Sequence, residues 1–253
     1  MKYPNPKFPG MSMVTPAEID KSIKKYYIGL KGWKVKKLGS ISTIVDLIDF
    51  CIEDYRAWGD AVLMGSGAYL KIGSFPTEID EAKRYVKSEV EKYLTSAYPT
   101  SQSDYDEWHK NICENLANKT MYFLAYSTYR KTSTDKFKNK YGFTIGNAQK
   151  FLNMLMKDLY ACLNSNKRIM PVYEEYFEFC HMPLDSYILR FVDDIRFRMK
   201  YKKSPRTYTW AGMNTYGDYM NEQKDIRDFV NSDKITPKTT VLQTEFVVWP
   251  LYK

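Results

Sequence analysis

Hydrophobic side chains recur every three or four positions along most of the chain, which is the spacing of an amphipathic α-helix. Helix punctuation supports the first such segment, because Thr15 offers an N-cap and Pro16 suits the first helical position. The pattern is that of a protein built mainly from helices. The helices that it predicts cover residues 15–32, 40–58, 76–98 and 103–121.

Two more helix starts are expected in the middle of the chain. One strong helix opens from Phe143, with Lys150 outside its apolar stripe, and a turn or short helix follows at Tyr173–Phe179. Pro183 restricts the preceding residue to an extended backbone, so no helix runs through this point. Asp185 is then well placed to cap the next helix by accepting its first free N–H groups. The stripe of the first helix comprises Ala148, Leu152, Leu155, Leu159 and Cys162.

Strand-like patterning is scarce. Only Thr239–Trp249 has the β-branched and aromatic density of a strand, and the glycine-containing stretch Met64–Ser74 is expected to be a loop. The predicted fold is therefore mainly α. It is an irregular multi-helix bundle of about eight or more helices, which could form two lobes around a cleft, with a short extended C-terminal segment. A single helical domain over residues 1–253 is expected.

Composition narrows the class further. The 253 residues are 44% hydrophobic, which is enough to bury a substantial core. No apolar run is long enough to span a membrane and the first residues lack the apolar core of a signal peptide, so we expect a cytoplasmic protein without a membrane partner. The chain has only two histidines and no paired cysteine motif, so no metal or other cofactor is expected. Four reduced, buried thiols are predicted: Cys51, Cys113, Cys162 and Cys180.

The net charge of +8, from 38 Lys and Arg against 30 Asp and Glu, suits an anionic partner such as nucleic acid. Basic side chains gather in two places, before the helix that opens at Phe143 and after Ile195, and they could contact a phosphate backbone. A solvated surface explains the first run equally well. These candidates are Lys136, Lys138, Lys140, Arg196, Lys200, Lys202, Lys203 and Arg206.

Lys150 and Asp185 are the candidate chemical groups. A lysine held in a partly apolar pocket loses its proton more easily and becomes nucleophilic. A carboxylate fixed at a helix start can face a cleft and stabilise positive charge. Without any chemistry, Lys150 would be an exposed lysine and Asp185 only a helix cap. No nucleophile elbow or Ser-His-Asp pattern offers a competing site.

These residues carry a family resemblance. The order of a basic segment, a Gly-containing hairpin (Tyr141–Gly146), a Gln149-Lys150 helix and a Pro183-Leu184-Asp185 helix start resembles the helix-hairpin-helix DNA glycosylases, nearest to their archaeal 8-oxoguanine branch. Thr144 stands where the common hairpin has its first glycine. The similar region is contained within residues 129–200, the candidate catalytic region.

The resemblance implies excision of a damaged or modified base, including hypermodified phage bases, from a nucleotide flipped out of duplex DNA. It implies that Lys150 attacks the sugar C1′ and that Asp185 deprotonates it or stabilises the charged transition state. Trp210 and Trp249 are candidates for stacking on the extruded base, although core positions are common for tryptophan. The hairpin and helix start would contact DNA through Gly142, Gly146, Asn147 and Gln149.

A second hypothesis needs no chemistry. The same charge and helix starts would serve a non-enzymatic module that binds nucleic acid, a nucleotide signal or a partner protein in host–phage conflict. The catalytic hypothesis makes a geometric prediction: Lys150 and Asp185 should approach to within hydrogen-bonding distance or about one bridging water, in a groove lined with basic residues.

Overall fold

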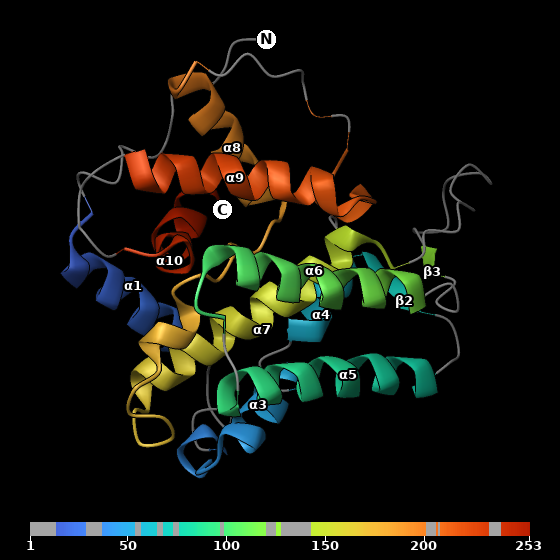
Figure 1. Cartoon of the computed structure of the whole chain (residues 1–253), viewed down its shortest axis with the longest axis vertical. Coiled ribbons are helices and arrows are strands. Elements are labelled where there is room, and N and C mark those ends of the chain that lie inside the picture. Colours follow the sequence, from blue (N-terminus) through green and yellow to red (C-terminus); the bar gives the residue numbers. More distant parts are fainter. Residues whose placement is uncertain are drawn as a thin grey trace.

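The computed structural model describes residues 14–28, 37–53, 57–64, 68–72, 76–96, 99–119, 125–127, 143–200, 206, 208–232 and 239–253. Helices dominate these residues, as the sequence predicted (Figure 1). The α-helices are α1 (Pro16–Ile28), α3 (Ile44–Glu53), α4 (Ala57–Val62), α5 (Pro76–Thr95), α6 (Gln102–Lys119), α7 (Ile145–Ser165), α8 (Ser186–Arg198), α9 (Tyr216–Ser232) and α10 (Val241–Tyr252). Two 3-10 helices, η4 (Glu174–Phe177) and η5 (Trp210–Gly212), lie between them.

Helix α7 is the centre of the bundle, with the other helices arranged around it (Figure 1). It packs against α1, α3, α4, α6, α9 and both 3-10 helices. It is buried along nearly its whole length, because apolar residues occur on all its sides. Its predicted stripe, from Ala148 to Cys162, is buried as expected. Most of the polar residues of α7 are enclosed too, and several of them belong to the two clusters described below.

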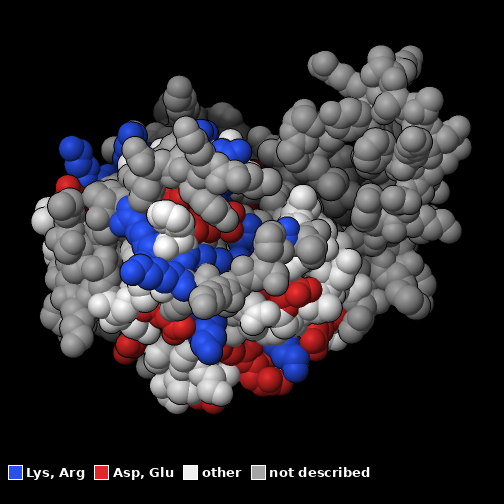
Figure 2. Space-filling model, turned by 90° about the horizontal axis from the view of Figure 1, so that it is seen from above, with Lys and Arg blue, Asp and Glu red and all other residues white. Residues whose placement is uncertain are grey.

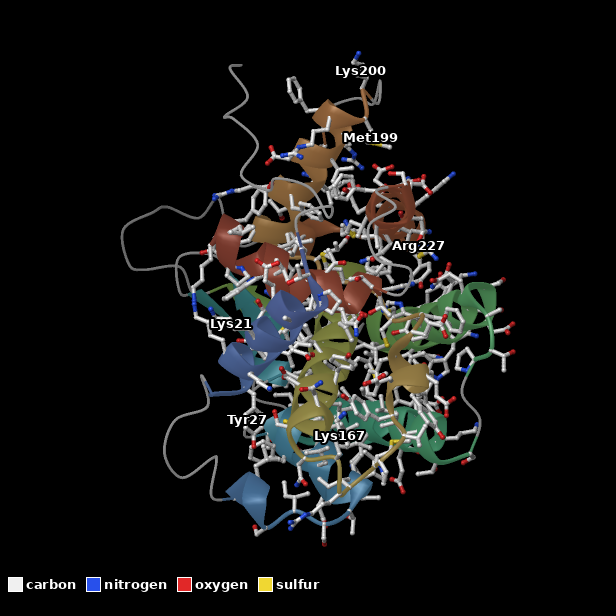
Figure 3. All side chains as sticks on the ribbon, turned by 90° about the vertical axis from the view of Figure 1, so that its left-hand side faces the viewer. Lys21, Tyr27, Lys167, Met199, Lys200 and Arg227 are labelled. Atoms are coloured by element: carbon white, nitrogen blue, oxygen red, sulfur yellow. The ribbon has the colours of Figure 1, made fainter. Side chains whose placement is uncertain are left out.

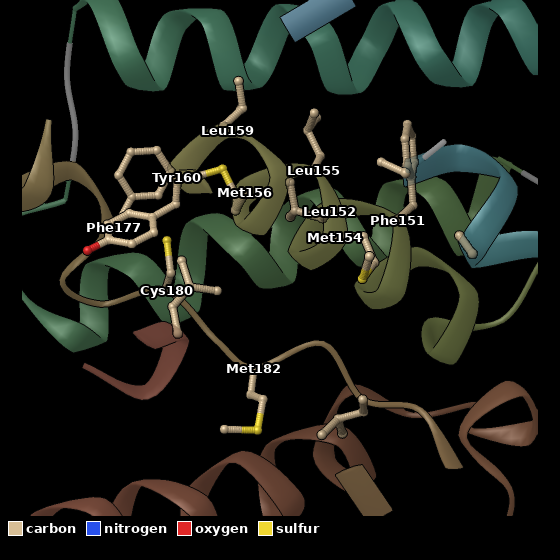
Figure 4. Close-up of a cluster of buried hydrophobic side chains, with 14 of the residues drawn as sticks. Phe151, Leu152, Met154, Leu155, Met156, Leu159, Tyr160, Phe177, Cys180 and Met182 are labelled. Carbon is tan, nitrogen blue, oxygen red and sulfur yellow. The ribbon is translucent and has the colours of Figure 1, made fainter. Parts of the chain in front are cut away.

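The core around α7 mixes aliphatic, sulfur-containing and aromatic side chains. Figure 4 shows Leu155 and Leu159 of α7 pointing away from Cys180 and Met182, which lie with Phe177 on the segment between α7 and α8. These five residues expose 1% of their surface or less. This segment therefore follows α7 closely and leads directly to the start of α8. The four cysteines are reduced and buried, as predicted.

Three short strands accompany the helices. The antiparallel strands β1 (Leu63–Met64), β2 (Ala68–Ile72) and β3 (Ala125–Ser127) form a sheet in the order β1-β2-β3. Leu63 pairs with Tyr69, and Leu70 pairs with Ser127. The predicted loop at Met64–Ser74 is therefore wrong in part.

The C-terminal prediction is also wrong, because the segment that was expected to be extended forms helix α10. Thr240 caps this helix in a capping box, in which its side chain accepts a hydrogen bond from the backbone N–H of Gln243 and the Gln243 side chain bonds back to the cap. Burial of Leu242, Phe246 and Val248 then outweighs the strand preference of the β-branched residues. No helix in the described ranges is both long and apolar enough to cross a membrane.

Candidate active site

Asp185 occupies the N-cap of α8, as the sequence predicted. Its backbone is extended (φ −134°, ψ −174°), so the helix begins at the next residue. Its Oδ1 accepts hydrogen bonds from the backbone N–H groups of Tyr187 (2.8 Å) and Ile188 (2.9 Å). These bonds fix one edge of the carboxylate against the helix and leave Oδ2 directed elsewhere.

Lys150 of α7 meets Asp185 from the other side. Its Nζ lies 3.9 Å from Asp185 Oδ2, and the two side chains are 12% and 14% exposed. The expected distance between these residues is thus confirmed, whereas the groove lined with basic residues stays a prediction. Lys150 is the sixth residue of α7 and therefore lies in the second turn of this helix. The bundle encloses it, so it is not an exposed lysine on a polar face.

Both candidate tryptophans contact this pair. The Lys150 ammonium lies 4.4 Å from the ring centroid of Trp210 in η5, within cation–π range. The indole N–H of Trp249 in α10 donates a hydrogen bond of 3.0 Å to Asp185 Oδ2. The structure therefore gathers all four residues from α7, α8, α10 and η5. Trp249 contributes its polar edge to Asp185, which differs from the predicted role of stacking on a base.

A second lysine continues this arrangement along α7. Lys157 lies about two helical turns after Lys150, on the same side of the helix. Its Nζ lies 2.5 Å from Glu245 Oε2 of α10, and these side chains are only 2% and 1% exposed. The Lys157 ammonium also lies 4.2 Å from the ring centroid of Tyr26 and 5.4 Å from that of Trp249. We call Lys150, Lys157, Asp185, Glu245, Trp210 and Trp249 the charged cluster.

Burial lowers the pKa of Lys150, because it removes water that stabilises the charged ammonium more than the neutral amine. The carboxylates of Asp185, Asp60 and Glu245 oppose this shift, whereas the positive charge of Lys157 adds to it. Burial also raises the pKa of Glu245, which Lys157 partly offsets. Lys150 is therefore easier to deprotonate than an ordinary lysine, as an amine nucleophile requires.

Asp158 borders the charged cluster. Burial raises the pKa of this carboxyl well above its usual value, although Tyr26 donates a hydrogen bond of 2.6 Å to its Oδ1. Its Oδ2 has no hydrogen-bond partner among the described residues. Asp158 is therefore protonated more readily than an ordinary aspartate, which weakens the negative charge that it places beside Lys157.

Gly146 does not lie in a hairpin, which corrects the prediction. The helix already begins at Ile145, with Thr144 as its N-cap, and Gly146 belongs to the first turn. Its N–H donates to the carbonyl oxygen of Met213 at 3.0 Å, so this amide does not face a phosphate. A Cβ added at Gly146 would lie 1.7 Å from the carbonyl oxygen of Trp210. Glycine lets η5 approach α7 closely enough to place Trp210 over Lys150.

Asn147 and Gln149 are likewise bound within the protein and are 1% and 0% exposed. Asn147 donates to the carbonyl oxygen of Ala61 at 2.7 Å. Gln149 accepts from the N–H of Leu184 (3.1 Å) and donates to the carbonyl oxygen of the same residue (3.0 Å). The predicted contact of these two side chains with DNA is not compatible with this burial. Gln149 instead fixes the residue before Asp185 against α7.

Two of the predicted phosphate contacts are internal ion pairs. Arg196 of α8 binds Glu222 (3.0 Å) and Asp225 (2.7 Å) of α9, and its side chain is 13% exposed. Arg206 binds the same Glu222 at 2.9 Å and also Asp193. These arginines join α8 and α9 because acidic residues of α9 face them, which corrects their assignment to DNA binding.

Lys200 is exposed just beyond the C-terminal end of α8, at the outer tip of the molecule (Figure 3). It has a positive φ of 53°, a conformation that ends the helix. On the face seen in Figure 2, basic side chains gather near the middle and acidic ones lie directly beside them. The remaining predicted contacts lie outside the described residues: Lys136, Lys138, Lys140, Gly142, Lys202 and Lys203.

Both histidines belong to a second polar cluster on α7. His181 lies between Asp106 (Nε2 to Oδ1, 2.7 Å) and the Tyr219 hydroxyl (Nδ1 to Oη, 2.6 Å). His109 lies 3.0 Å from Asn153 Oδ1 through Nε2, and Asn153 donates to Tyr219 at 2.9 Å. Asn153 also donates to Gln149 at 3.1 Å, which connects these residues to the two hydrogen bonds between Gln149 and the backbone of Leu184. We call Asp106, His109, Asn153, His181 and Tyr219 the histidine network.

In the histidine network the two histidines are neutral, and the charge of Asp106 is balanced by an ion pair. Burial lowers the pKa of both histidines, so both rings are neutral near pH 7. Burial would raise the pKa of Asp106, but hydrogen bonds from His181 and Arg227 and the positive charge of Arg227 outweigh it, and the pKa is lowered to about 2. Asp106 is therefore ionised, accepts the His181 Nε2–H and pairs with Arg227 at 2.8 Å.

The described residues contain no group of three or more His, Cys, Asp or Glu side chains that could hold a metal ion. Comparison of the chain with protein-family models, curated proteins and solved structures finds no match. The chemistry of the site therefore has to be argued from its own geometry.

The sequence held a signal for two residues of the charged cluster that were not predicted, Lys157 and Glu245. Lys157 follows Lys150 at a spacing that returns to the same side of a helix. The pairing of Glu245 with Lys157 could be inferred only if the C-terminal segment was taken as a helix. The Thr240–Gln243 spacing of a capping box, Thr-x-x-Gln, indicated that helix.

Proposed function

We propose that this protein is a DNA glycosylase that removes a damaged or modified base from a flipped nucleotide. The observation that carries the proposal is the buried Lys150 amine, with its lowered pKa, 3.9 Å from a carboxylate whose orientation is fixed. This pair combines a nucleophile that is neutral more readily than usual with a group that stabilises positive charge.

In the proposed reaction, the bond between C1′ and the base nitrogen breaks and its electron pair leaves with the base. The base takes up a proton from water, and C1′ develops the positive charge of an oxocarbenium ion. Asp185 stabilises that charge, much as fixed carboxylates do in glycoside hydrolysis. The lone pair of Lys150 Nζ then forms a bond to C1′, and Asp185 accepts the proton that the nitrogen releases.

A hydrolytic form of the reaction uses the same carboxylate. Asp185 can activate water in place of the lysine, in which case Lys150 contributes only its position and charge. The two forms differ in one product, because only amine attack leaves a covalent protein–DNA intermediate. The nitrogen lone pair forms a C1′=Nζ bond as the C1′–O4′ bond breaks and O4′ takes up the proton held by Asp185, and borohydride can reduce and trap the resulting Schiff base. Asp185 is required in both forms.

The test is base excision by the full chain on duplexes that carry oxidised, alkylated or glucosylated bases, with unmodified duplexes alongside. We expect abasic sites in at least one modified duplex and a loss of about a hundredfold or more in Asp185→Asn. Asparagine is itself a good N-cap, so this substitution removes the charge and keeps the helix start.

Lys83→Ala is the matched control for Lys150→Ala. Lys83 pairs with Glu53 at 2.8 Å and is 19% exposed, similar to Lys150, but it lies on α5. Lys83→Ala should excise the base and form the trapped intermediate like the parent protein. Lys150→Ala should not form the trapped intermediate. If the protein shows salt-sensitive DNA binding without excision of any base, and Asp185→Asn binds equally well, the proposal is wrong. That result would favour the non-enzymatic binding module.

A further inference from the structure

The C-terminal helix completes the candidate site through one hydrogen bond. Asp185 Oδ1 is occupied by two backbone N–H groups of its own helix. Its Oδ2 accepts the indole N–H of Trp249 at 3.0 Å and faces Lys150 at 3.9 Å. If the carboxylate rotated about the hydrogen bonds of Oδ1, Oδ2 would no longer face Lys150. The hydrogen bond from Trp249 to Oδ2 therefore fixes the direction of the second oxygen.

Trp249 is suited to this role by chemistry and by packing. An indole N–H only donates, so it neither takes a proton from Asp185 nor competes with it as a base. The ring packs edge-on against Tyr187 (centroids 6.0 Å apart, 85° between planes). The ammonium of Lys253 lies 4.5 Å from the same ring centroid. The side chain is therefore held in place from both α8 and the end of α10.

The Lys157–Glu245 pair fixes the helix that carries Trp249. Glu245 and Trp249 are one turn apart on α10, so they present neighbouring positions to α7. Lys157 binds Glu245 at 2.5 Å and lies 5.4 Å from the Trp249 ring centroid. This buried ion pair thus sets the rotation and height of α10 relative to α7, and with them the position of the indole N–H.

We propose that Trp249 is a positioning residue that aims the Asp185 carboxylate, and that the Lys157–Glu245 pair holds Trp249 in register. The assignment rests on the proposed excision reaction. It replaces the stacking of Trp249 on an extruded base, because the ring is already packed and its polar edge is bonded to Asp185.

The test compares Trp249→Phe with Trp108→Phe in steady-state excision kinetics. Both tryptophans are partly buried, and Trp108 packs between Tyr93 and Tyr105 of another aromatic cluster. Trp249→Phe keeps a ring but removes the donor, so we expect kcat to fall about tenfold or more while KM changes less than about threefold. Trp108→Phe should behave like the parent. A rise in KM at unchanged kcat would instead assign base stacking to Trp249 and overturn the inference.

A spectroscopic readout keeps the inference testable if Trp249→Phe folds poorly. The indole N–H resonance of Trp249, assigned in the ¹⁵N-labelled full chain, should move in Asp185→Asn, while that of Trp108 stays in place. An unmoved Trp249 resonance would show that the hydrogen bond is absent and would overturn the inference. Absence of excision by the parent protein would instead reject the proposed function, so the two failures are distinguishable.

Discussion

The charged cluster and the histidine network lie on neighbouring sides of α7, and both are buried, yet they are satisfied differently. In the histidine network, hydrogen bonds join Asp106, His181, Tyr219, Asn153 and His109 in one continuous chain. In the charged cluster, Lys150 and Asp185 are 3.9 Å apart, which is within ion-pair range but beyond a direct hydrogen bond.

We propose that this difference separates a structural role from a chemical one. A network in which neutral rings, hydroxyls and amides are hydrogen-bonded, and in which the ionised Asp106 pairs with Arg227, specifies one arrangement of helices. A desolvated amine beside a carboxylate costs stability, and proteins retain such arrangements chiefly at functional sites. Gln149 connects the two regions, because it binds both Asn153 of the network and Leu184, the neighbour of Asp185.

The largest expected effect comes from breaking the buried ion pair. Lys157→Met leaves Glu245 buried without a partner, so we expect the free energy of unfolding to fall by about 3–5 kcal/mol in urea denaturation. Adding Glu245→Leu should recover most of that loss. Lys87→Met is the control, because its pair with Asp49 has the same 2.5 Å distance but is 28% and 51% exposed. A loss below about 1 kcal/mol in Lys157→Met would contradict the comparison.

The histidine network should lose less stability when it is cut. Asn153→Ala removes the partner of His109, Tyr219 and Gln149, so we expect a loss of about 1–3 kcal/mol in the same assay. Asn111→Ala, on the exposed side of α6, should change stability by less than about 0.5 kcal/mol. If Asn153→Ala were as stable as the parent, the network would not join α6, α7 and α9 as described.

Acid should destabilise the fold through the two histidines. Their pKa values are lowered from 6.5 by burial, so the unfolded chain binds more protons than the folded one below that pH. Their contribution to stability is complete above pH 6.5 and is lost as the pH falls further. The urea midpoint should therefore drop between about pH 7 and about pH 5. A midpoint that is level over this range would mean that the rings are not desolvated.

The smallest effects concern the titration of Lys150, followed by NMR of ¹³C-labelled lysine side chains. Asp185 raises the pKa of Lys150, so Asp185→Asn should lower that pKa further. Lys157 has the opposite influence, so Lys157→Met should raise it. We expect the two variants to move the pKa of Lys150 in opposite directions. Shifts of the same sign in both variants would show that the two charges do not act on Lys150.

The start of α8 and the candidate pair were accessible from the sequence. Pro183 and Asp185 define the helix start through local backbone rules, and the resemblance brought Lys150 and Asp185 together. The roles of Arg196 and Arg206 were not accessible in this way. A run of basic residues does not reveal its partners, and the acidic Glu222 and Asp225 lie on α9, a helix that the prediction did not include.

The C-terminal segment shows why local propensity was insufficient. Valine, threonine and aromatic residues favour strands, but burial of α10 against α1 and α8 decided its structure. That error concealed Glu245 and the polar edge of Trp249, both of which depend on helical spacing. Gly146 shows the same limit, because its close contact with the Trp210 carbonyl comes from residues that are distant in sequence.

The most direct test of the account is borohydride trapping on a modified duplex, with the adduct located by peptide mass spectrometry. We predict a covalent adduct on Lys150 that forms more slowly in Asp185→Asn and is absent in Lys150→Ala. Base excision that leaves no adduct, or an adduct on another lysine, would contradict the assignment of Lys150 as the nucleophile.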